Sequence, residues 1–170
     1  MTASAACAQP MPPLIFRVTA WLDGQSETQR LTMPAAPSAT GQHITLLAHT
    51  HTYDVGGSMP RAEWEKRFAA GLPDSTIPLG CDTTACQFIR HRWAKTGIDV
   101  TLRPVSASGT FQALSIGVTL HRFRPSSDAQ VPSLVDTWTH DIDTSLRMGD
   151  SRTLDLDGQG TVTIERLATP

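Results

Sequence analysis

Apolar and polar side chains alternate along the first extended part of the chain. The apolar positions of residues 14–22 fall on every second residue, at Leu14, Phe16, Val18, Ala20 and Leu22. A period of two is typical of a half-buried β-strand. Asp23-Gly24 favours a turn, so we expect residues 28–33 to return as the second arm of a hairpin. Residues 34–41 contain only Pro, Ala, Ser, Thr and Gly, which predicts a loop.

The alternation resumes in residues 42–54. It places Ile44, Leu46 and Ala48 on one face of a predicted strand, and the opposite face receives His43, Thr45, Leu47, His49, His51 and Tyr53. Gly56-Gly57 is expected to end this strand. Residues 60–71 then predict a short helix, because a proline lies near the start, a glycine lies at the end, and Trp64 and Phe68 are one turn apart.

Residues 72–94 give a weaker pattern. Pro73, Pro78 and Gly80 make residues 72–86 loop-like. Residues 85–94 are open to two interpretations, a helix with one apolar stripe or the first arm of a hairpin. The spacing of the apolar residues favours the helix.

The carboxy-terminal half predicts strands without an intervening helix, at residues 98–102, 111–123, 137–147, 151–156 and 161–167. Asp157-Gly158-Gln159-Gly160 is a strong hairpin turn between the last two. The predicted fold is therefore mostly β, an antiparallel β-sandwich or meander with one or two short helices. We expect residues 1–13 to be a flexible leader or tether and residues 14–170 to form a single β-rich domain.

Composition agrees with this fold class and excludes several partners. Charged residues are 18% of the 170 positions, and 12 prolines and 12 glycines disfavour a bundle of long helices. The formal net charge of -2 gives no electrostatic footprint for nucleic acid. No segment approaches the roughly 18 to 20 consecutive apolar residues of a transmembrane helix.

Cysteine spacing bears on the cellular compartment. Cys81 and Cys86 are separated by Asp-Thr-Thr-Ala, which closes a short loop when oxidised and fits no common zinc knuckle. We interpret them as a disulfide, which favours an oxidising compartment such as the periplasm or the cell surface. The alternative is a pair of small buried residues in a cytosolic protein. Residues 4–7 end in Cys7 like a lipoprotein processing site, which makes Cys7 a lipidation candidate or an irrelevant cysteine in a tail.

One region resembles a known family. Residues 97–104, Gly-Ile-Asp-Val-Thr-Leu-Arg-Pro, look like the segment of bacterial secretins in which a glycine opens an alternating strand closed by a proline. Residues 111–123 are similar to the long strand that follows there, and residues 136–156 to a later hairpin. The chain lacks the proline and glycine motif that follows this hairpin in secretins, and it is too short for a ring-forming gate plus periplasmic domains. The resemblance implies an envelope protein with a secretin-like β-region.

Candidate chemistry is sparse. His49 and His51 project from one strand face and are candidate metal ligands beside Tyr53 or Asp54. A complete site would need His91, His121 or His140 from distant strands. The alternative is that both are polar residues on a solvated sheet face.

Aspartates and tryptophans carry further alternatives. Asp155, Asp157 and Gly158 match the start of a calcium loop without its closing glutamate, so a hairpin turn is the better interpretation. The four tryptophans could stack on a carbohydrate, although packing in a core or sheet is their commoner use. They are Trp21, Trp64, Trp93 and Trp138. The chain has no Gly-x-Ser-x-Gly elbow and no phosphate loop.

The sequence thus favours a non-enzymatic, extracytoplasmic bacterial envelope protein without a cofactor. We expect it to act through protein contacts in a secretion or pilus assembly, with a homo-oligomer left open. The second hypothesis is a periplasmic metal- or ligand-binding β-sandwich that uses His49 and His51. A hydrolase whose site is assembled from separated residues is the third.

Overall fold

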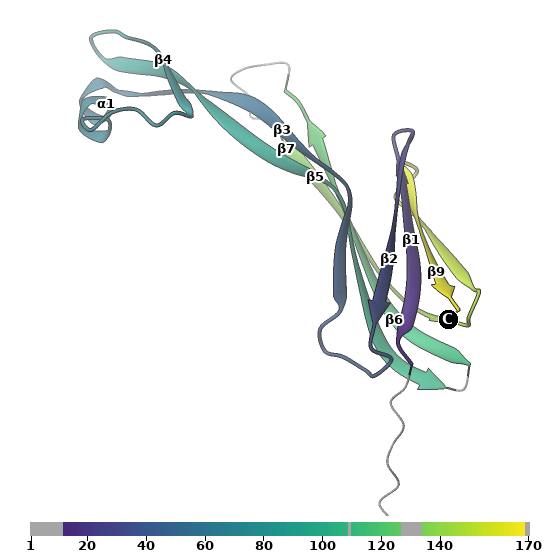
Figure 1. Ribbon diagram of the computed structural model, residues 1–170. Helices are drawn as coiled ribbons and strands as arrows, with labels where there is room; N and C mark the ends of the chain where they lie inside the picture. Colours follow the sequence, from purple (N-terminus) through teal and green to yellow (C-terminus); the bar gives the residue numbers. More distant parts are fainter. Residues whose placement is uncertain (1–11, 109, 127–133, 169–170) are drawn as a thin grey trace, which may run out of the picture. The chain divides into compact units, whose positions relative to one another are not determined.

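The computed structural model describes residues 12–108, 110–126 and 134–168 (Figure 1). Within these ranges the chain forms nine strands and one short helix. The strands are β1 (Leu14–Leu22), β2 (Gln25–Met33), β3 (Gln42–Pro60), β4 (Thr76–Cys81), β5 (Ala85–Ser108), β6 (Phe111–Arg124), β7 (Leu134–Leu146), β8 (Ser151–Asp155) and β9 (Gly160–Leu167), and the helix is α1 (Arg61–Arg67). The mostly β prediction is confirmed.

The strands form two antiparallel sheets. One has the order β2-β1-β9-β8, and the other has the order β3-β5-β6-β7 with β4 added beside β5. The chain also divides into two compact units. Unit 1 comprises the described parts of residues 1–47, 98–120 and 138–170, and unit 2 those of residues 48–97 and 121–137. The long strands β3, β5, β6 and β7 contribute residues to both units.

Unit 1 is a β-sandwich. Its hydrophobic core is made by inward residues of both sheets, because alternate positions on each strand face the opposite sheet. Phe16, Val18 and Ile164 contribute from the first sheet, and Val100 and Ile116 contribute from the second, all with no exposed surface. The predicted hairpin of residues 14–33 is confirmed, with Leu14 paired to Met33 at its open end.

The carboxy-terminal strands are divided between the two sheets. β5, β6 and β7 lie in one sheet, whereas β8 and β9 join β1 in the other. β9 pairs antiparallel with both β1 and β8, so that Ile164 lies opposite Val18 and Val162 lies opposite Leu154. The predicted sandwich therefore forms by crossing between sheets rather than as one continuous meander.

Unit 2 has a much smaller buried interior. Its strands are residues 48–60 of β3, all of β4, residues 85–97 of β5, residues 121–124 of β6 and residues 134–137 of β7, and it also contains α1. Buried side chains in its described part are Met59, Thr76, Cys86, Phe88 and Ala94. A unit with so few buried apolar groups depends on its hydrogen-bonded strands and on local links for its order.

The set of β3 side chains that is shielded from solvent changes at Leu47. Ile44 and Leu46 are at least partly shielded from solvent in unit 1, whereas in unit 2 every second residue from His51 to Met59 is at least partly shielded. Leu47 itself is buried with φ of +51°, a left-handed conformation that shifts the two-residue alternation by one. The predicted division of residues 42–54 into two constant faces is therefore wrong beyond Leu46.

Four expected elements differ from the structure. The predicted helix of residues 60–71 is confirmed only as Arg61–Arg67, and β3 continues through Gly56-Gly57 to Pro60. The loop expected at residues 72–86 contains β4, and the helix favoured at residues 85–94 is the first part of β5. Strand pairing supplies the backbone hydrogen bonds of these segments, which overrides their local preferences.

Candidate functional site

The far end of unit 2 is held by a disulfide. Cys81 ends β4 and Cys86 lies directly opposite on β5, and their sulfur atoms are bonded. Between them, Asp82 Oδ1 accepts hydrogen bonds from the backbone N–H of Ala85 (2.7 Å), the N–H of Thr84 (2.7 Å) and the hydroxyl of Thr84 (2.9 Å). These bonds, with that from Ala85 first, hold the pKa of the Asp82 carboxyl below its ordinary value because they stabilise the charged form. The predicted disulfide joins the strands through an ordered turn.

One face of the unit 2 sheet is covered by α1. Trp64 on the helix lies 4.5 Å from Phe68 and 5.4 Å from Phe88 of β5, measured between ring centroids. The guanidinium carbon of Arg90 lies 4.9 Å from the centroid of the Phe88 ring. This cluster explains the helical spacing of Trp64 and Phe68, since one turn brings the two rings together while Trp64 also reaches Phe88.

The opposite face leaves apolar side chains in solvent. Ile77 of β4 is paired with Ile89 of β5, so both project to the side away from Phe88. Ile77 is 43% exposed, Leu79 is 58% exposed and Trp93 is 64% exposed. Ile77 and Leu79 are two residues apart on one strand, and neighbouring exposed apolar side chains are a feature of interaction surfaces.

The outer edge of β4 is poorly suited to adding another strand. Pro78 lacks a backbone donor, and the pairing of β4 with β5 shifts register between Pro78 and Gly80. Prolines and bulges are the means by which natural edge strands avoid pairing with other chains. A partner of this surface would therefore contact the side chains of Ile77 and Leu79 rather than the backbone edge.

The two predicted metal ligands lie close together without a third. The rings of His49 and His51 are 6.5 Å apart. His51 Nε2 lies 3.0 Å from the Thr96 hydroxyl, and its ring stacks on Phe123 at 4.8 Å. In the described ranges no group of three or more His, Cys, Asp or Glu residues could hold a metal ion. The metal site thus stays a prediction.

The three histidines considered as further metal ligands have separate surroundings. His121 Nδ1 lies 3.5 Å from the Thr137 hydroxyl, and the ring of His140 stacks on Trp138 at 5.5 Å in unit 1. His91 Nδ1 lies 2.5 Å from Asp54 Oδ1, an arrangement that orients the base in hydrolases. Among the described residues no hydroxyl hydrogen-bonds to the His91 side chain.

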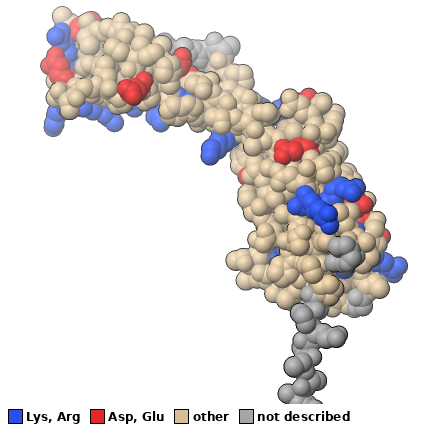
Figure 2. All heavy atoms as spheres, in the orientation of Figure 1, with Lys and Arg blue, Asp and Glu red and all other residues tan. Residues whose placement is uncertain are grey.

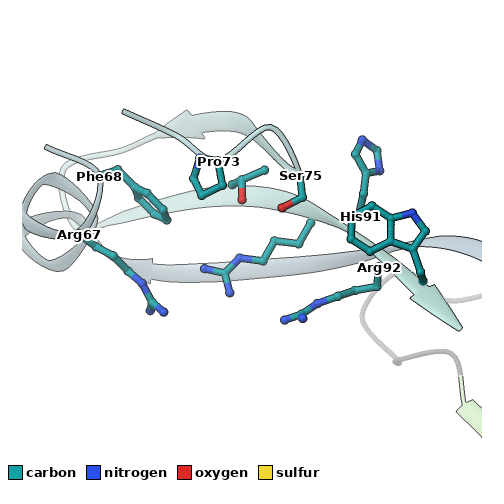
Figure 3. A pocket seen from close by; sticks show the side chains of 9 residues that line it. Arg67, Phe68, Pro73, Ser75, His91 and Arg92 are labelled. Atoms are coloured by element: carbon teal, nitrogen blue, oxygen red, sulfur yellow. The ribbon is translucent and has the colours of Figure 1, made fainter. Parts of the chain in front are cut away.

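Unit 2 also carries a groove of about 350 Å³ (Figure 3). Arg67 and Phe68 border it at the end of α1, Ser75 and Thr76 border it at the start of β4, and residues 90–93 of β5 complete it. The backbone N–H of His91 donates to the Ser75 carbonyl at 2.8 Å, which fixes β5 against the chain entering β4. Figure 2 shows Lys and Arg side chains along one margin of unit 2.

The remaining predicted positions take structural roles or fall outside the described residues. Asp155 Oδ1 accepts a hydrogen bond from the Gly158 N–H at 2.5 Å, as a hairpin turn requires. Trp64 and Trp138 are partly buried, whereas Trp21 is 48% exposed. The lipidation candidate Cys7 lies outside the part of the chain that the structure describes.

Comparison with protein families, with curated protein sequences and with solved structures finds no match for this chain. The one helix in the described ranges is too short to cross a membrane.

Sequence reasoning missed the groove and the exposed apolar face. Both depend on β5 being a strand at residues 85–94, where the chain reads Arg90-His91-Arg92-Trp93. Read as a strand, this segment puts two arginines on one face and His91 and Trp93 on the other. This alternation could have indicated the two faces of β5 from the sequence. It was missed because residues 85–94 were interpreted as a helix.

Proposed function

We propose that this protein is a non-enzymatic component of a bacterial cell-envelope assembly of the secretion or pilus type, and that it binds a partner protein through unit 2. The observation that carries the proposal is the apolar surface formed by Ile77 and Leu79. These side chains are 43% and 58% exposed on a unit with a small buried interior. Exposing apolar side chains to water is unfavourable in free energy. Binding of a partner protein over Ile77 and Leu79 would remove that cost, which supports a role of this surface in protein contacts.

The compartment in this proposal rests on the cysteines. The Cys81–Cys86 disulfide persists in oxidising surroundings such as the periplasm or the outer membrane surface. The likeness of residues 97–157 to secretins supports an envelope machine as the setting. The absence of an elbow or phosphate-loop motif from the sequence supports a binding role over catalysis.

Site-specific photo-crosslinking in the native cells tests the proposal. A photoreactive residue at Ile77 or Leu79 should give a discrete crosslink to a protein of a secretion or pilus assembly, identified by mass spectrometry. Val105 of unit 1 is the matched control, because it is an apolar β5 residue with 47% exposure. It should give no such product.

A charge-introducing variant completes the test. Ile77→Asp with Leu79→Asp should abolish co-purification of that partner while leaving the melting temperature unchanged, because both side chains are already exposed. Val105→Asp should leave co-purification intact. Crosslinks only to a second copy of this chain, only to cytosolic proteins, or none at all would overturn the proposal.

A further inference from the structure

The outer face of the first sheet in unit 1 carries an exposed indole. Trp21 of β1 follows Ala20, which is buried in the core, so the Trp21 side chain projects to the solvent side of the sheet. This side chain is 48% exposed. Among the residues that the structure describes, it makes no hydrogen bond, ring stack or cation contact. A flat apolar surface with a polar N–H at its edge is therefore open to a ligand.

The neighbours of Trp21 on this face are polar side chains. The register places Ser26 of β2 directly beside Trp21 on one side and Thr161 of β9 directly beside it on the other. Asp155 of β8 lies opposite Thr161, so the four residues form one row across the sheet. Directly paired residues project to the same face of a sheet. The preceding residue, Leu154, is buried, which agrees with Asp155 facing solvent.

A second row of hydroxyl groups runs parallel to the first. It takes one threonine from each strand, namely Thr28, Thr19, Thr163 and Thr153. The hydroxyls of Thr19 and Thr28 are 2.9 Å apart, and those of Thr153 and Thr163 are also 2.9 Å apart. A hydroxyl has one donor and two acceptor positions, so each member keeps a position for a further partner. The indole thus lies within a surface of hydrogen-bonding groups.

The charges around Trp21 are acidic. Asp155 belongs to the first row, and Asp23 and Asp157 lie in the two hairpin turns at the same end of the strands (Figure 1). Asp155 accepts the Gly158 N–H through Oδ1, which leaves Oδ2 to accept a hydrogen bond from a ligand hydroxyl. These carboxylates would repel an anion placed on the row. The ligand that suits this face is therefore uncharged.

We propose that this face binds a neutral saccharide chain of extended, β-linked hexose units. The chain crosses the strands along the row of Ser26, Trp21, Thr161 and Asp155. One sugar ring lies on the indole, and the hydroxyls of the neighbouring units bond to the three polar side chains. Adjacent strands are about 4.8 Å apart, close to the length of one sugar unit in an extended chain. Successive sugar units therefore meet successive strands.

A neutral saccharide suits this face better than a protein or a nucleic acid. The centre of a protein interface is generally apolar and dry, whereas hydroxyls and a carboxylate flank Trp21. A nucleic acid needs a basic surface for its phosphates. A sugar ring has an apolar C–H face and a rim of hydroxyls, which matches an indole with polar neighbours.

This site is separate from the proposed protein contact, which uses Ile77 and Leu79 of unit 2. Every residue of the two rows belongs to unit 1. Loss of the sugar site should therefore leave the crosslinks of Ile77 and Leu79 unchanged, and either proposal can fail without the other.

Titration of the full-length protein with neutral hexasaccharides tests the site. The probes are cellohexaose, chitohexaose and maltohexaose, followed by tryptophan fluorescence and by amide chemical shifts. We expect saturable binding of cellohexaose or chitohexaose, with shifts centred on residues 19–21, 26–28 and 161–163. The stronger of the two identifies the chain as a glucose or an N-acetylglucosamine polymer. Maltohexaose has the same glucose units as cellohexaose, but its α links curl the chain away from the row. It should bind at least about tenfold more weakly, which corresponds to the loss of one or two hydrogen bonds.

Variants test the indole and a hydroxyl separately. Trp21→Thr removes the ring but keeps a residue that favours strands, and it should weaken binding about tenfold. Thr161→Val removes a hydroxyl at nearly constant volume and should weaken binding about threefold. Trp93→Thr replaces an exposed indole of unit 2, and Thr139→Val replaces an exposed threonine of the other sheet. These two matched controls should bind as the unmodified chain does, and all four variants should keep its melting temperature within a few degrees.

Several results would overturn the proposal. They are absence of saturable binding for both cellohexaose and chitohexaose, equal binding of maltohexaose, or unchanged binding by folded Trp21→Thr. Equal losses in Trp93→Thr would place the sugar elsewhere. Tighter binding of trigalacturonate would contradict the acidic character of the site. Dimerisation that Trp21→Thr abolishes, without any sugar binding, would assign the face to a second copy of the chain.

Discussion

A methyl carbon on Gly57 of β3 would lie 2.5 Å from Cζ of Phe88 on β5. Phe88 also packs against Trp64, so its ring has little room to move. Gly57→Ala should therefore destabilise unit 2 by about 1 to 3 kcal/mol, the usual cost of overpacking. Hydrogen exchange of the β4 and β5 amides measures the loss.

Gly56 supplies the matched control for this substitution. It is the adjacent residue on the same strand and it is exposed. Gly56→Ala should leave the exchange rates of β4 and β5 near those of the unmodified chain. If Gly57→Ala also left them unchanged, the close approach of β3 to Phe88 would be wrong.

Thiol titration of the unfolded, unreduced protein should find no free thiol at Cys81 or Cys86. A loop this short constrains the unfolded chain less than a fifteen-residue loop, for which the estimate is about 3 kcal/mol. Reduction should therefore loosen the turn at Asp82 while unit 1 stays folded. Two reactive thiols at these positions would remove the main support for an oxidising compartment.

Asp82 makes the same turn sensitive to acid. Its carboxyl pKa is lowered in the folded chain, first by the hydrogen bond from Ala85, so the folded state binds this proton less readily than the unfolded state. The stabilisation is present above the ordinary aspartate pKa of about 3.9 and is lost as pH falls through the lower folded value. Carbon NMR of the Asp82 carboxyl should show the lowered midpoint. Asp82→Asn should remove the acid-dependent shift of the Thr84 amide, and an unshifted midpoint would contradict the role of these bonds.

The parts of the fold that the sequence predicts are those determined by neighbouring residues. The hairpin from Leu14 to Met33 and the pairing of β8 with β9 depend on alternation and a tight turn, and both can be recognised locally. The joining of β9 to β1 could not be predicted in this way, because it unites the two ends of the chain. Residues at the ends carry no local signal for their distant partner.

The error at residues 85–94 has a specific cause. Phe88 faces α1, whereas Ile89 and Trp93 project from the other side of the same strand. A strand with apolar residues on both faces can imitate the spacing of one helical stripe. The disulfide could still be predicted from the sequence, because Cys81 and Cys86 are close in the chain. The groove could not be predicted, because α1, β4 and β5 come together only in the folded unit.

The metal hypothesis for His49 and His51 has a direct test. Zinc or copper bound at these rings should raise the melting temperature with occupancy, and alanine at either position should abolish the rise. We expect no specific rise in the melting temperature, because the described residues offer no third ligand. His51 also contacts the Thr96 hydroxyl through Nε2 and stacks on Phe123. His140→Ala is the control. A saturable rise that requires both His49 and His51 would favour a metal-binding protein.

The turn between β8 and β9 provides the last prediction. Asp157 and Gly158 have φ of +57° and +71°, and the Gln159 N–H donates to the Leu156 carbonyl at 3.1 Å. Two successive positive φ angles make this a primed turn, whose twist matches that of the strands. The turn thereby sets the register that brings Leu154 and Val162 into the core together.

Gly158→Val should lower the free energy of unfolding of unit 1 by at least about 1 to 2 kcal/mol, because a β-branched residue is strained at positive φ. Open space surrounds the position where its side chain would begin, so the loss comes from the backbone and not from a clash. Asp157→Gly is the matched variant, because glycine accepts the same conformation and should preserve stability within about 1 kcal/mol. Urea denaturation followed by the amide signals of Val162 and Ile164 measures both. Equal stability of the two variants would show that pairing of β9 with β1, rather than the turn, determines the register of β8.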